Sequence, residues 1–129
     1  MHDNREILMG RVERTVRERI IPAQFESVKP LSVSRWIVPA EGSVVGEPVS
    51  FEEAKAASFE PIAVGDAWGK PWETVWFRLE ADVPQLDLGE DHLEIVFDLG
   101  WFDHSAGFQC EGLVRDEEGH IVKAINPRN

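Results

Sequence analysis

The sequence has a single cysteine, Cys110, and no apolar run that approaches the length of a membrane span. One thiol cannot form an internal disulfide, which favours a reducing, intracellular setting. A membrane-crossing helix needs about 20 apolar residues in a row, and the runs here are far shorter. The charged start of the chain, MHDNRE, also lacks the pattern of a secretory signal. We therefore expect one cytoplasmic domain of 129 residues with a core of its own.

Positive charge is scarce as well. The chain has 13 Lys and Arg against 24 Asp and Glu, and its net charge is −11. This balance argues against nucleic acid and membranes as partners, because nucleic acid and anionic lipids carry negative charge themselves. The charge is uneven, with a net of +2 over residues 1–35 and −13 over residues 36–129. This favours a basic first element that docks on an acidic body, with a charge-steered partner as the alternative.

The sequence also lacks a complete catalytic or metal-binding pattern. There is no Gly-x-Ser-x-Gly motif, and no two of the 4 histidines are spaced as metal ligands. Asp103 and His104, adjacent in a predicted loop, are only a weak signal for a metal site. Cys110 is expected to be a buried, unreactive thiol. Two carboxylates facing each other across a cleft remain the acid/base alternative, and the candidates near strand ends are Asp66, Glu73, Asp98, Asp103 and Glu111.

The first residues that carry a clear pattern predict an amphipathic helix over 4–20. Asp3 or Asn4 is expected to cap this helix, and Pro22 is expected to end it. The apolar side chains recur every four residues and form one stripe between charged positions. The stripe consists of Leu8, Val12, Val16 and Ile20. A single stripe needs a partner surface, either the body of this chain or another domain.

The rest of the chain is predicted to be mainly β. From Thr74 to Val83 apolar and polar residues alternate, which is typical of a strand with one buried face. A capping box at Ser50–Glu53 predicts a short helix over 51–57. Strands are predicted over residues 30–38, 59–64, 74–83, 92–99, 108–115 and 121–125. Together they predict an antiparallel β-sandwich of jelly-roll type over residues 23–129, decorated by an N-terminal helix at residues 1–22 and one short helix.

Tryptophan is the residue type most indicative of function. Residues 65–78 contain three of the five tryptophans of the chain. Trp68, Trp72 and Trp101 fall in predicted loops at strand ends, where an indole face can stack on the C–H face of a sugar ring. Asp103, shortly after Trp101, is the fourth candidate substrate-binding residue. The alternative is that these rings close an open end of the sandwich or meet a neighbouring domain.

Three segments occur in an order that indicates a family. Residues 65–78 read GDAWGKPWETVWFR, residues 98–100 read DLG, and residues 107–119 read GFQCEGLVRDEEG. In this order they resemble the region that precedes the catalytic domain in α-mannosidases of glycoside hydrolase family 38, of the cytosolic and vacuolar class. The resemblance covers residues 30–129. It implies a non-catalytic N-terminal β-sandwich domain of a larger enzyme, truncated before the catalytic domain.

The resemblance also implies what the parent enzyme does. Such enzymes are retaining exo-α-mannosidases with a catalytic aspartate and one divalent metal, usually zinc, in the catalytic domain. No position of this chain corresponds to those residues, so we assign it no catalytic residue, metal ligand or cofactor. The expected partners are the catalytic domain of the same polypeptide, further copies in a homo-oligomer and a mannose-containing oligosaccharide.

Two other functions stay open at this point. The chain is an autonomous carbohydrate-binding module if the loop tryptophans form a sugar platform. It is a protein-interaction or oligomerisation domain if the helix stripe binds another chain.

Overall fold

The computed structural model describes residues 4–24, 29–40, 46–83, 89, 92–101 and 110–126. The chain divides into two compact units, Met1–Ser32 and Val33–Asn129, and each is described by itself. The division drawn from the sequence, at residues 22 and 23, stays a prediction.

The first unit contains the expected helix. α1 (Arg5–Thr15) continues as a π-helical turn over Val16–Ile20 and a 3-10 turn over Ile21–Ala23. The helix predicted over 4–20 agrees with the α and π segments over 5–20, and Pro22 lies in the short 3-10 turn that follows, where its missing N–H breaks no helical hydrogen bond. Asn4, one of the two predicted caps, is the N-cap residue, but its side chain makes no cap hydrogen bond. Asp3 lies outside the described residues.

The π turn affects the apolar stripe of this helix. A step of four residues overshoots one α-helical turn by about 40°, so a stripe with this spacing drifts around the helix. The wider π turn reverses part of that drift between Val16 and Ile20. The four stripe residues are 37–57% exposed, so the first unit does not bury them itself. No helix within the described ranges is long and apolar enough to cross a membrane.

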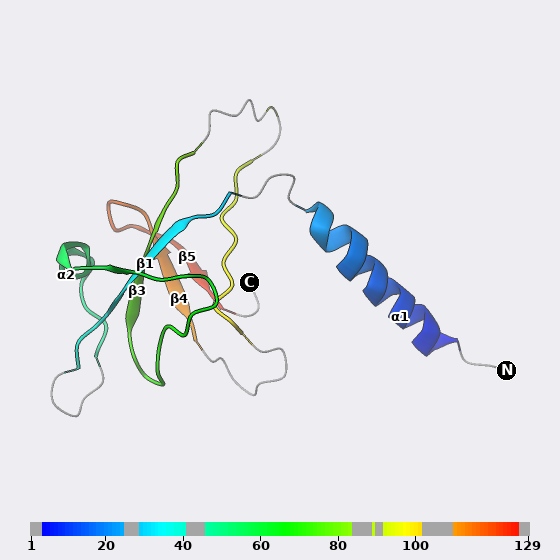
Figure 1. Ribbon diagram of the computed structural model, residues 1–129, viewed down its shortest axis with the longest axis horizontal. Coiled ribbons are helices and arrows are strands. Elements are labelled where there is room, and N and C mark those ends of the chain that lie inside the picture. The colour runs from blue at the N-terminus through cyan, green and yellow to red at the C-terminus, as the bar shows by residue number, and fades with distance from the viewer. Residues whose placement is uncertain are drawn as a thin grey trace. The chain divides into compact units, whose positions relative to one another are not determined.

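The second unit holds the sheets (Figure 1). β1 (Ser32–Ile37) lies between β2 (Glu60–Pro61) and β3 (Val75–Glu80), and it pairs with β2 in antiparallel fashion, with Arg35 opposite Glu60. β4 (Gly112–Arg115) and β5 (Ile121–Ile125) form an antiparallel hairpin with an irregularity between Val114 and Arg115. The predicted mainly β, antiparallel architecture is confirmed.

One predicted strand is wrong. Residues 92–99 form no strand, and the predicted strand over 108–115 starts only at Gly112, with 108 and 109 outside the described residues. Phe97 and Leu99 are half-buried as their alternation predicts, but Leu93 and Ile95 are exposed. Alternation predicts which side chains share a face, but a strand also needs a hydrogen-bonding partner for its backbone. Residues 92–99 have no ladder partner in the described parts of the chain.

α2 (Phe51–Ala56) begins as the sequence predicts. The Oγ of Ser50 accepts a hydrogen bond from the backbone N–H of Glu53 at 3.2 Å, which confirms the predicted cap. Ala54 of this helix and Val38 after β1 are 1% and 5% exposed, and they are the buried hydrophobic residues of the described structure. Gly46 is buried against Val38, whose backbone leaves no room there for a Cβ atom.

α2 also contacts the turn of the β4–β5 hairpin. The Phe51 ring lies 6.3 Å from the Trp76 ring of β3 and directly against Gly119 of the turn. The Nζ of Lys55 donates a hydrogen bond to the carbonyl of Glu117 at 2.9 Å. Because Gly119 has a φ of +91° and a Cβ there would meet Phe51 Cδ1 at 2.5 Å, both the turn and the contact require glycine.

We therefore predict that Gly119→Ala destabilises the domain by about 2–4 kcal/mol, because it adds a steric clash to backbone strain. Gly65→Ala is the matched control. Gly65 has a φ of +98° but no atom within 4 Å of the added Cβ, so we expect a loss of only about 1 kcal/mol there. Urea unfolding of both variants measures the difference. Equal losses would show that the Phe51 contact contributes nothing.

Candidate binding corner between two strands

The chain between β2 and β3, residues 62–74, forms a turn-rich segment that we call the corner. Trp68 anchors it from within, with its ring edge-on to Phe77 of β3 at 5.4 Å. Its indole Nε1 donates to the carbonyl of Leu99 at 3.3 Å. Trp68 is therefore half-buried, and it joins the corner to the 92–101 segment, which has no ladder partner in the described residues.

Polar side chains fix the rest of the corner. Arg35 of β1 donates from Nη1 to the carbonyl of Ala67 at 2.8 Å, and its Nε contacts Glu60 Oε1 at 3.0 Å. Asp66 folds back so that its Oδ2 accepts from the N–H of Ala63 at 3.1 Å. These bonds leave the backbone of the corner little freedom to rearrange.

Trp72 has the opposite environment to Trp68. Its side chain is 89% exposed, and its backbone has a φ of +70°. It occupies the third position of a β-turn in which the N–H of Glu73 donates to the carbonyl of Lys70 at 3.1 Å. Since Pro71 fixes a negative φ at the second position, this is a type II turn, whose third position normally holds Gly or Asn. The Glu73 carboxylate closes the turn by accepting from the N–H of Lys70 at 2.9 Å.

Trp101 is also held by the backbone. Its Nε1 donates to the carbonyl of Cys110 at 3.0 Å, and the indole is half-buried. Burial raises the pKa of the Cys110 thiol, and the opposing hydrogen bond from Trp101 does not cancel this effect. The thiol stays protonated at neutral pH, in keeping with the unreactive cysteine that the sequence predicts. Asp103 and His104 lie outside the described residues.

The structure thus separates the candidate sugar-binding residues. Two of the three indoles, Trp68 and Trp101, use their N–H groups to hold backbone segments together, and only Trp72 presents its ring to solvent. Three of the five candidate carboxylates are likewise engaged locally, since Asp66 and Glu73 close turns and Asp98 accepts from the N–H of Gly100 at 2.8 Å. Glu111 is exposed, and Asp103 lies outside the described residues.

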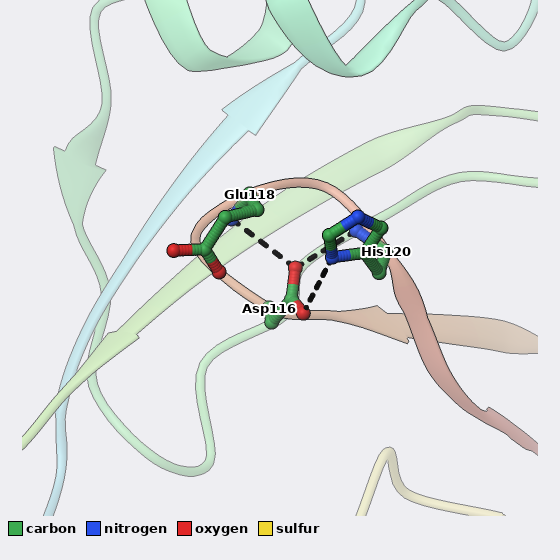
Figure 2. A group of neighbouring side chains, drawn as sticks. All are labelled: Asp116, Glu118 and His120. Atoms are coloured by element: carbon green, nitrogen blue, oxygen red, sulfur yellow. Dashed lines mark hydrogen bonds and ion pairs between the residues drawn. The ribbon is translucent and has the colours of Figure 1, made fainter.

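The structure also reveals a side-chain cluster that the sequence reasoning missed. Asp116, Glu118 and His120 in the β4–β5 turn have their ligand-type atoms within 4.8 Å of one another. Figure 2 shows the Asp116 carboxylate between the backbone N–H groups of the turn and the His120 ring. The alternating pattern Asp-x-Glu-x-His is the sequence feature from which this cluster could have been predicted.

The bonds of this cluster identify it as a turn closure. Asp116 Oδ1 accepts from the N–H groups of Glu118 and His120 at 3.1 and 2.8 Å, and its Oδ2 lies 3.0 Å from Nδ1 of His120. The Asp116 oxygens that a zinc ion would need thus face donors of the same turn, whereas no described hydrogen bond uses the carboxylate of Glu118. The Asp116 carboxylate is therefore committed to the turn, the family resemblance implies zinc only in the catalytic domain, and we derive no step through a metal in this chain.

The pKa of Asp116 makes this turn sensitive to acid. Desolvation raises the pKa of the carboxyl, but the backbone and side-chain hydrogen bonds from His120 outweigh it, so the pKa is lowered from its ordinary value. A carboxylate with a lowered folded-state pKa stabilises the fold above its unfolded-state pKa. That contribution is lost as the pH falls through the lowered folded-state value.

We predict that the wild-type hairpin loses stability in this acidic range and that Asp116→Asn removes the part of the loss due to this carboxyl. Thermal unfolding between pH 2 and pH 7 (about two units below to three units above the ordinary Asp pKa) measures the effect. Glu118→Gln is the control, because no hydrogen bond of this turn uses its carboxylate among those described. An unchanged acid dependence in Asp116→Asn would contradict the assignment.

Comparison with known proteins identifies the family of this chain. Residues 29–129 match the model of a family described as the α-mannosidase jelly-roll domain. The chain belongs to this family. The expected jelly-roll fold and the resemblance to an N-terminal domain of an α-mannosidase are thereby confirmed.

Two curated relatives carry the same name, alpha-mannosidase 2C1. The mouse protein is 36% identical over 93 residues, which are 64% of this chain and 9% of the relative, and the human protein is 36% identical over 76 residues, which are 56% and 7%. The matched region thus spans less than a tenth of the length of either relative. No solved structure matches the chain.

Within this jelly-roll domain the strained turn gives a direct prediction. Trp72→Gly should be more stable than Trp72→Ala by about 1 kcal/mol, because alanine keeps the strain of a Cβ at positive φ while glycine relieves it. Denaturant unfolding of the two variants measures this difference. A more stable alanine variant would contradict the turn geometry, since alanine is otherwise the less costly residue.

Proposed function

We propose that this chain is the non-catalytic N-terminal domain of a cytoplasmic α-mannosidase of glycoside hydrolase family 38. The observation that carries the proposal is the match of residues 29–129 to the α-mannosidase jelly-roll family. The proposed role is to support the catalytic domain of the same polypeptide, which hydrolyses terminal α-linked mannose. Relatives that extend far beyond the matched region support this division of labour.

The chemistry of the described residues supports a role outside catalysis. The carboxylates of Asp66, Glu73 and Asp116 accept backbone hydrogen bonds in turns, so they are committed to holding the fold. A glycosidase needs two carboxyl groups that face the scissile bond instead. We place the catalytic aspartate and the zinc of the parent enzyme in its catalytic domain.

The same domain is proposed to assist assembly into a homo-oligomer. The apolar stripe of the first unit is not buried within that unit, and the net charge of +2 over residues 1–35 complements the −13 of residues 36–129. A basic helix with an apolar face suits an acidic protein surface. Light scattering with and without residues 1–22 measures this contribution.

An autonomous carbohydrate-binding module is the second candidate function. One observation favours it, the 89% exposed indole of Trp72 on a fixed turn. Titration of the chain with mannobiose, followed by tryptophan fluorescence, separates the two functions. A saturable change in wild type that is absent in Trp72→Gly would favour the module, and no change would favour the supporting domain.

The main proposal predicts where activity resides. The full-length polypeptide that contains this domain should hydrolyse an aryl α-mannoside, and the purified chain of 129 residues should not. Asp116→Asn in the full-length polypeptide is the control for the turn cluster, and it should leave both turnover and zinc content unchanged. Turnover by the chain alone, from a preparation free of host mannosidase, would overturn the proposal.

A further inference from the structure

We propose that Trp72, together with Val64, is the anchor through which this domain docks on the catalytic domain of its own polypeptide. This inference rests on the function proposed above and names the surface through which the domain docks.

Exposure singles out these two residues. Val64 is 97% and Trp72 is 89% exposed, the two highest values among the exposed large hydrophobic residues of the described structure. Both lie in the corner, eight positions apart in the sequence. Scattered exposed aliphatic residues are common on protein surfaces, but a tryptophan exposed to this degree is unusual, because its ring carries so much apolar area.

The backbone at Trp72 adds a cost that the domain itself does not need. A φ of +70° places a bulky residue where glycine is strongly preferred, and neither the ring nor its N–H is held within the domain by any described contact. Backbone strain of this kind is found mainly at positions where the side chain binds a ligand or a partner. Here the turn directs a large apolar ring into solvent at the expense of the domain's own stability.

The corner is rigid enough to act as a docking surface. The turn around Trp72 is closed twice between Lys70 and Glu73, by a backbone bond and by the Glu73 carboxylate. On the other side Arg35 holds the carbonyl of Ala67, and Trp68 ties the corner to Leu99. A surface fixed before binding loses little conformational entropy when the partner docks.

The chemistry of the corner fits a protein better than a sugar. A sugar site needs polar groups that fix the hydroxyls of the ring, in addition to a stacking surface. The carboxylates nearest to Trp72 and Val64 in the sequence, Glu73 and Asp66, are used to close turns. An exposed aromatic ring on a rigid segment that also exposes an aliphatic residue is instead typical of the residues that dominate protein–protein interfaces.

The same polypeptide is the occupant that the comparisons favour. The matched region is 9% and 7% of the two curated relatives, so most of the protein surface in such an enzyme belongs to the remaining polypeptide. A partner in the same chain is present at a high effective concentration, so two anchoring side chains suffice where a separate partner would need a larger interface.

Hydroxyl-radical footprinting with mass spectrometry tests this proposal on the unmodified protein. The chain and the full-length polypeptide are oxidised in parallel, and the rate at Trp72 is compared with that at Trp68. In the chain alone Trp72 should be oxidised faster than Trp68. In the full-length polypeptide its rate should fall to that of Trp68 or below, whereas free oxidation of Trp72 there would overturn the proposal.

Added ligand and dilution identify the other possible occupants. Protection of Trp72 that appears only when an α-mannoside is added would assign the residue to a sugar site and overturn the proposal. Protection in the chain alone that disappears on dilution would assign it to a contact between copies, with the same consequence. Hydrolysis of an aryl α-mannoside by the full-length polypeptide is measured on the same preparation, so the proposed function and the docking surface can fail independently.

A variant series gives a second readout. In the full-length polypeptide Trp72→Gly should lower the temperature of the first unfolding transition, because the domain loses its anchor, although the same substitution relieves strain in the domain itself. Val64→Thr should lower it less, and the isosteric Val122→Thr on β5, also at an exposed valine, should leave it in place. Because the strain relief is the same in both forms, the transition is compared with that of the chain of 129 residues alone. An equal shift in the two forms would contradict the proposal.

Discussion

The hydrogen bond from the Trp68 indole to the carbonyl of Leu99 is the interaction on which the arrangement of this domain depends. Residues 92–99 have no ladder partner within the described structure, so side chains have to hold this segment in place. The Trp101 indole holds the end of this segment in the same way, by donating to the carbonyl of Cys110, two residues before β4 begins. Each indole offers a large packing surface and one directed donor, which joins segments that regular pairing leaves apart.

This use of tryptophan bears directly on function. Because Trp68 packs on Phe77 and fixes the corner from within, the neighbouring turn can hold Trp72 in a strained backbone and expose its ring. Three carboxylates, those of Asp66, Glu73 and Asp116, also have a structural role, because they accept backbone hydrogen bonds that close turns. The chain belongs to the α-mannosidase jelly-roll family, and these features support the proposal that the domain presents a docking surface while catalysis lies in the rest of the polypeptide.

Local signals in the sequence predicted much of the fold. The Ser50 cap and the alternation around Val75–Glu80 act over a few residues and appear in the structure as expected. The strand over 92–99 was wrong because pairing depends on a distant partner, and Asn4 occupies the predicted N-cap position without making the cap hydrogen bond. For the site, the sequence correctly predicted that these tryptophans lie in loops. It could not distinguish the exposed, strained Trp72 from the half-buried Trp68, because exposure and backbone strain arise only in the folded chain.

The central claim is that this domain contributes structure and a docking surface, while catalysis lies in the rest of the polypeptide. The most direct test is an experimental structure of the full-length polypeptide with zinc and a mannose-derived inhibitor bound. The account predicts that the indole of Trp72 is buried against the catalytic domain and that no side chain of residues 29–129 contacts the metal. A zinc ion held by residues of this domain, or Trp72 free in solvent, would contradict it.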